Sequence, residues 1–196
     1  MMMEGFGPVL QRTLRKRPDL EVVREGKYST GLSRQDYFDW PAQLEKLVGK
    51  YNPDMVVICM GANDPQDIID ENRKRHHADS ESWKTIYRSR AERLLAVATA
   101  KGAKAVWVGL PVMGKEPYST RVRRLSELQK EACETYHAAF VDTVKVLADG
   151  SLVIAQPLMT SMKSVADLVP AEAENKRCGR QVSTVAATDA QKFDLL

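Results

Sequence analysis

The stretch that decides the fold reads Met-Val-Val-Ile-Cys-Met-Gly-Ala-Asn-Asp and occupies residues 55–64. Its first six residues are all apolar, and turn-forming residues come directly after them. An uninterrupted apolar run between turn signals is typical of a strand that is buried on both faces of a parallel sheet. We therefore predict a strand over residues 55–60 with a turn at its carboxyl end.

Outward from this strand, helical and strand patterns alternate along the chain. Three further strands are predicted over residues 20–24, 104–110 and 139–143. Apolar residues at helical spacing predict helices over residues 8–17, 41–51, 82–100 and 119–137. Strands that alternate with helices indicate an α/β sandwich with a parallel sheet.

Composition excludes several classes of protein. The chain has 196 residues with 29 basic and 26 acidic side chains, a net charge of +3 that is too small to argue for a nucleic-acid partner. No apolar run approaches the roughly 20 residues of a membrane span, and the first residues show no signal peptide. Cys59, Cys133 and Cys178 form neither a zinc spacing nor an even disulfide set.

Two segments interrupt the regular pattern. Residues 67–81 are strongly charged, and we expect His76 and His77 there to lie in a solvated loop with no metal between them. His137 closes the last predicted helix, and we expect it to be structural. No amphipathic pattern continues after residue 150, so we predict a domain over residues 1–150 and an irregular tail over 151–196.

Two loops carry residues that could do chemistry. Gly61 and Asn63 come after the central strand at its carboxyl end, where open α/β sheets bind their ligands. The Asn63 amide can donate to a developing oxyanion, and Gly31 in the loop after residue 27 can present a backbone N–H to the same place. The alternative is that both loops are plain turns, since turns favour the same residue types.

Four sequence segments resemble motifs of the SGNH hydrolase superfamily of GDSL-type esterases and lipases. They span residues 28–34, 37–41, 60–66 and 108–113. Within it they are similar to an uncharacterised bacterial branch associated with the cell envelope. The resemblance covers about residues 1–150 and implies a flavodoxin-like three-layer sandwich with a parallel sheet.

Carried over position by position, the resemblance implies that Gly31 and Asn63 are oxyanion-hole donors. It also implies that Gly61, Asp64, Pro111 and Met113 support the site. No metal and no cofactor are implied.

The chain departs from the family pattern in two ways. Residues 1–7 resemble the segment directly after the family's Gly-Asp-Ser, so we expect the first strand and the nucleophilic serine to lie before Met1. In the family that strand lies between the strands predicted here at 20–24 and 55–60. No Asp-x-x-His occurs, so the chain as given has neither nucleophile nor general base. A reading frame that shifts by two bases after Gly150 is compatible with the codons that the residues of the tail allow.

The resemblance therefore implies a serine ester hydrolase domain that is inactive as given. Its substrate would be a small-molecule or carbohydrate acyl ester of the cell envelope, and its location periplasmic or secreted. Two alternatives stay open: a non-catalytic SGNH-like binding module, and a flavodoxin-like binder of small ligands. The second alternative requires a Gly-rich phosphate loop after a strand, which this sequence lacks.

Overall fold

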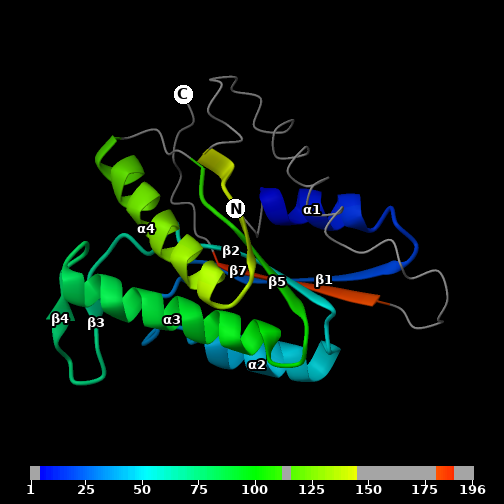
Figure 1. Ribbon diagram of the computed structural model, residues 1–196, viewed down its shortest axis with the longest axis horizontal. Helices are drawn as coiled ribbons and strands as arrows, with labels where there is room; N and C mark the ends of the chain where they lie inside the picture. The colour runs from blue at the N-terminus through cyan, green and yellow to red at the C-terminus, as the bar shows by residue number, and fades with distance from the viewer. Residues whose placement is uncertain (1–4, 112–115, 145–179, 188–196) are drawn as a thin grey trace.

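The computed structural model describes residues 5–111 and 116–144, together with the backbone of residues 180–187 (Figure 1). In chain order its elements are α1 (Phe6–Leu14), β1 (Leu20–Lys27), α2 (Trp40–Tyr51), β2 (Met55–Met60), β3 (Ile68–Ile69), β4 (Arg75–His76), α3 (Glu81–Thr99), β5 (Lys104–Val108), α4 (Glu116–Thr135), β6 (Ala139–Val141) and β7 (Arg180–Ala187).

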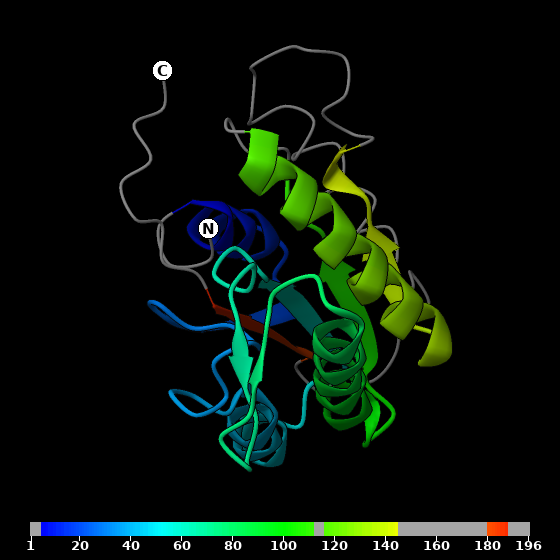
Figure 2. The same cartoon turned by 90° about the vertical axis from the view of Figure 1, so that its left-hand side faces the viewer.

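Five parallel strands form one sheet in the order β1-β7-β2-β5-β6. Side chains of β2 alternate between two cores: Val56, Ile58 and Met60 pack with α2, α3 and α4. Their neighbours along the strand pack with α1 on the other face. Figures 1 and 2 show α1 on one side of the sheet and α2 and α3 on the other. The predicted three-layer, flavodoxin-like α/β fold with a parallel sheet is confirmed.

The place between β1 and β2 is occupied by β7. Val182 pairs with Val22 on one side and Met55 on the other, and Ala187 pairs with Lys27 and Met60. The sequence predicts that this place lacks its family strand, and it predicts no strand within residues 151–196. In the structure eight residues of the predicted tail form the strand there, and its pairing on both sides gives the backbone groups of β1 and β2 their partners. Apart from residues 180–187, the predicted tail lies outside the described residues.

Element boundaries agree with the sequence patterns apart from small shifts. Strand β2 spans the predicted residues 55–60, whereas β1 continues to Lys27. Helix α2 begins after Asp39, whose side chain accepts a hydrogen bond from the Ala42 N–H. Helix α3 begins after Ser80, which caps it in the same way. The small antiparallel hairpin of β3 and β4, inside the charged segment, was not predicted.

None of the helices in the described ranges is long and apolar enough to cross a membrane.

We predict that Val185→Pro lowers the free energy of unfolding by about 2 kcal/mol or more, because proline removes a donor from a strand paired on both sides. Denaturant unfolding of this variant should be compared with Val185→Thr, which keeps the backbone N–H and the β-branched shape. Equal stability of the two variants would show that β7 does not hold the sheet together.

Candidate functional site

Two loops leave the same edge of the sheet side by side. Lys27 ends β1 and Met60 ends β2, and both pair with Ala187 at the end of β7. The Gly31 loop (residues 28–39) and the Asn63 loop (residues 61–67) therefore start at the carboxyl edge of the parallel sheet. This is the edge at which α/β proteins of this type place their ligands.

A buried carboxylate joins the two loops. Asp64 is fully buried, and its Oδ1 accepts a hydrogen bond of 2.8 Å from the Ser33 N–H. The Ser33 hydroxyl in turn donates to the Asp64 carbonyl oxygen at 2.8 Å. The Leu32 N–H lies near enough to lower the pKa of the Asp64 carboxyl. Asp64 thus holds the part of the Gly31 loop that follows Gly31, at Ser33.

Two helices support this carboxylate from the opposite side. The Tyr87 hydroxyl on α3 donates to Asp64 Oδ2 at 3.1 Å. Gln129 Nε2 on α4 donates to the Tyr87 oxygen at 3.0 Å and to the Met60 carbonyl at 3.1 Å. Sequence reasoning missed both residues. The available signal was a polar side chain within the apolar stripe of each helix, where Tyr87 and Gln129 are completely buried.

Burial governs the ionisation of Asp64. Desolvation raises the pKa of its carboxyl above the usual value, while hydrogen bonds from Ser33, Leu32 and Tyr87 act in the opposite direction. The net shift is upward, so ionised Asp64 is stabilised only in part by its donors. Burial also raises the pKa of Tyr87 well above its ordinary value, so this hydroxyl keeps its proton and can donate a hydrogen bond to the carboxylate.

Steric constraints explain the glycines of both loops. A Cβ atom on Gly31 would lie 2.1 Å from Asp64 Oδ1, far inside van der Waals contact. Gly61 has a φ of +128°, and a Cβ there would lie 2.7 Å from Gln129 Nε2. Both positions therefore exclude a side chain: Gly31 because its loop lies against Asp64, and Gly61 because its loop lies against helix α4.

The side chain of Asn63 reaches the Gly31 loop directly. Its Nδ2 donates to the Thr30 carbonyl oxygen at 3.2 Å. Among the described residues, the second Nδ2 hydrogen and the buried Gly31 N–H have no partner. Thr30 C=O and Gly31 N–H belong to one trans peptide, so they point in opposite directions. The structure thus brings the two predicted donors together, but it does not aim both at one point.

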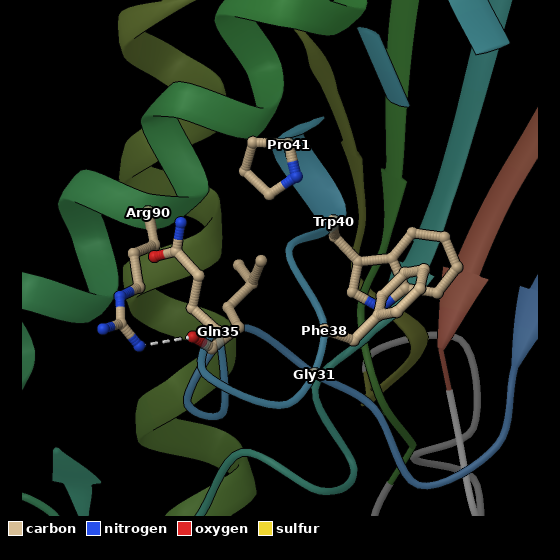
Figure 3. A pocket seen from close by; sticks show the side chains of 7 residues that line it. Gly31, Gln35, Phe38, Trp40, Pro41 and Arg90 are labelled. Carbon is tan, nitrogen blue, oxygen red and sulfur yellow. Dashed lines mark hydrogen bonds between the residues drawn. The ribbon is translucent and has the colours of Figure 1, made fainter. Parts of the chain in front are cut away.

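A shallow hollow lies beside this peptide (Figure 3). Arg90 of α3 borders it and donates to the Leu32 carbonyl at 2.7 Å and to the Ser33 carbonyl at 3.1 Å. Figure 3 shows Trp40 on the other side of Gly31 from Arg90. The indole N–H of Trp40 donates to Thr30 Oγ1 at 3.0 Å. The residues lining the hollow are Gly31, Leu32, Gln35, Phe38, Trp40, Pro41 and Arg90.

Two predicted supporting residues are less informative. Pro111 lies half-buried just beyond the end of β5, and Met113 lies outside the described residues.

The expectation that His76 is solvated is wrong: the side chain is buried and its Nε2 lies 2.9 Å from Asp70 Oδ2. His77 and His137 are exposed. No group of three or more metal-ligating side chains occurs in the part of the chain that the structure describes.

Four hydroxyl and thiol groups near the sheet are either hydrogen-bonded to the backbone or buried. Thr30 Oγ1 donates to the Lys27 carbonyl at 2.7 Å, and the Ser33 hydroxyl is bound to the Asp64 backbone. Cys59 and Cys133 are buried, and burial raises the pKa of each thiol to about 12. None of these four side chains has the exposure and proton acceptor that an activated nucleophile requires.

Comparison with known proteins gives one family. A family model described as "Protein of unknown function (DUF459)" matches residues 1–164. A search of curated proteins finds no match.

We predict that Gly31→Ala destabilises the protein by about 1–3 kcal/mol, because the added methyl group overlaps the Asp64 carboxylate. Gly49→Ala is the matched control: Gly49 lies within α2 and an added Cβ meets nothing within 4 Å. That control should gain about 0.4–1 kcal/mol. If both alanines have the same effect in denaturant unfolding, the close contact between Gly31 and Asp64 is wrong.

We predict that the stability difference between the wild type and Asp64→Asn depends on pH. Because the Asp64 pKa is raised in the folded state, the folded protein holds this proton more tightly than the unfolded chain. The wild type should therefore lose stability relative to Asp64→Asn as pH rises from the unfolded value through the folded pKa. The slope should not exceed about 1.4 kcal/mol per pH unit. A difference that is flat or increases with pH would contradict the burial of this carboxyl.

Proposed function

Because the chain belongs to the DUF459 family, which is SGNH-hydrolase-like, we propose that it is the domain of an acyl-ester hydrolase and supplies the oxyanion-binding part of its site. In this proposal the Gly31 N–H and the Asn63 amide hold the negative oxygen of a tetrahedral intermediate. Asp64 keeps the two loops that carry these donors in contact.

The observation that carries the proposal is the Gly31 N–H, a hydrogen-bond donor without an acceptor among the described residues. The Gly31 N–H is buried at the carboxyl edge of the sheet, and it has no acceptor among the described residues. A buried N–H without a partner costs free energy, so such groups are rare unless something binds them. Asn63, which also has an unused amide hydrogen, approaches the same peptide from the neighbouring loop.

The chemistry that these donors serve is acyl transfer. A serine oxygen attacks the ester carbonyl, a histidine takes the serine proton, and the carbonyl oxygen becomes an anion. One well-placed donor to this anion contributes about 2.7–4 kcal/mol to the transition state. The printed sequence contains no Gly-Asp-Ser and no Asp-x-x-His, so the proposal assigns neither attack nor proton transfer to its residues.

Substrate class and location belong to the same proposal. The family resemblance supports a small-molecule or carbohydrate acyl ester of the cell envelope, and with it a periplasmic or secreted location. Neither the hollow beside Gly31 nor its lining residues distinguish among acyl esters.

A second candidate is a binding module of the same fold that has no catalytic role. The observation in its favour is that the Thr30 and Ser33 hydroxyls, one on each side of Gly31 in the chain, both donate to backbone carbonyls. Such a module would bind an anionic or carbonyl group at the same two donors.

We predict that methylphosphonate, a tetrahedral anion, binds at these donors and shifts the amide resonances of Gly31 and of the Asn63 side chain. Asn63→Ala should weaken this binding about tenfold or more, since a hydrogen bond to a charged group contributes roughly 1.5–3 kcal/mol. Asn72→Ala is the control, because Asn72 is exposed in the hairpin turn. If the probe does not bind, or if both variants bind it equally well, the proposed site is wrong.

The same preparation should not hydrolyse p-nitrophenyl acetate faster than a control protein. Turnover that disappears when a serine of this chain is replaced would support ester hydrolysis and show that this serine is the nucleophile, which would contradict our prediction.

A further inference from the structure

We propose that the Thr30–Gly31 peptide is a switch that turns over when an oxyanion binds, and that the structure holds it in the closed position. This inference rests on the proposed function, since it concerns the regulation of the same oxyanion site. In the closed position the Asn63 amide donates to the Thr30 carbonyl oxygen. That oxygen therefore occupies the amide donor that a bound anion would use.

The geometry of one peptide creates the conflict. The Thr30 C=O points toward Asn63, so the Gly31 N–H on the same trans peptide points away from it. A single oxygen cannot lie on both sides of this peptide at once. A half-turn of the peptide plane would exchange the two groups, bringing the Gly31 N–H to the Asn63 side and releasing the Asn63 amide.

The segments on both sides of this peptide are fixed. The Thr30 hydroxyl donates to Lys27 and accepts from Trp40, which holds the residue before the peptide. The Ser33 N–H is bound to Asp64, and the Leu32 and Ser33 carbonyls accept from Arg90. Among the described residues, the Thr30 carbonyl accepts one hydrogen bond, from Asn63. Rotation of the peptide plane therefore breaks only this hydrogen bond of the carbonyl.

Glycine is the residue that permits the movement. A half-turn changes ψ of the residue before the peptide and φ of the residue after it. Gly31 can adopt negative and positive φ at almost equal cost, whereas any other residue would resist one of the two positions. The contact of Gly31 with Asp64 excludes a Cβ in the closed position, so glycine is required for space as well as for rotation.

Charge supplies the driving force. A bound anion accepts from both the Gly31 N–H and the Asn63 amide, and charge-assisted hydrogen bonds are roughly twice as strong as neutral ones. The closed position instead has one neutral bond and one unpaired buried N–H. The ligand therefore favours the open position because it makes contacts there that the closed position does not allow.

The test measures the orientation of this peptide by NMR in the full chain. The distance from the Thr30 Hα to the Gly31 amide proton changes when the peptide turns, so the corresponding NOE reports the switch. Saturation with methylphosphonate should change its intensity several-fold and leave the Leu32 and Ser33 amides in place. Binding of the probe with an unchanged NOE would overturn the switch.

A second variant tests the switch without any ligand. Asn63→Asp replaces the donor by a carboxylate, which repels the Thr30 carbonyl and can accept from the Gly31 N–H. This variant should show the altered NOE in the absence of methylphosphonate, whereas Asn72→Asp should show the wild-type value. An unchanged NOE in Asn63→Asp would overturn the switch. An altered NOE in that variant, together with no binding of methylphosphonate to the wild type, would show that the peptide can turn but would reject the oxyanion site and with it the ligand-driven switch.

Discussion

The site depends on one buried carboxylate. Asp64 joins the loop after β2 to the loop after β1, and Tyr87 and Gln129 connect it to two helices. Burying an ionised carboxyl is unfavourable, as the raised pKa of Asp64 shows, and the converging donors offset only part of this cost. What the carboxylate provides is geometry, because an acceptor that binds the Ser33 N–H and the Tyr87 hydroxyl together fixes a turn more closely than apolar packing can.

The sheet determines where this carboxylate can act. Strand β2 is buried on both faces, so its register is fixed by two cores at once and its carboxyl end has one position. Strand β7 then holds β1 at the correct distance, since β1 and β2 each pair with β7. Asp64 can reach Ser33 only because both loops start from the same level of this three-strand unit. The stability of the sheet and the geometry of the site are thus coupled through β7.

Much of the fold could be predicted from periodicity, because the central strands and the helices obey it. The apolar run at 55–60 marks β2 without ambiguity, and helical spacing marks α2 to α4. The hairpin of β3 and β4 could not be predicted from periodicity, because it has no apolar pattern. It is stabilised by side-chain hydrogen bonds such as the one between Asp70 and His76. Strand β7 was missed because its pairing partners are more than 100 residues away in sequence.

The candidate site could be predicted in part. The resemblance identified Gly31, Asn63 and Asp64, and the structure places all three on adjoining loops. The resemblance could not give the direction of the Thr30–Gly31 peptide, because a half-turn of one peptide leaves the sequence unchanged. Tyr87 and Gln129 were missed for a different reason: on an amphipathic helix a buried polar residue is judged by its neighbours in space, which the sequence does not list.

The most direct test of the account is the scalar coupling across the hydrogen bond between the Ser33 nitrogen and the Asp64 carboxyl carbon. Such a coupling exists only when the donor and the acceptor share a hydrogen bond, so it reports the junction of the two loops itself. With a nitrogen-to-oxygen distance of 2.8 Å, we predict a measurable coupling and a Ser33 amide that is strongly protected from exchange. The absence of this coupling, together with rapid exchange of the Ser33 amide, would contradict the account.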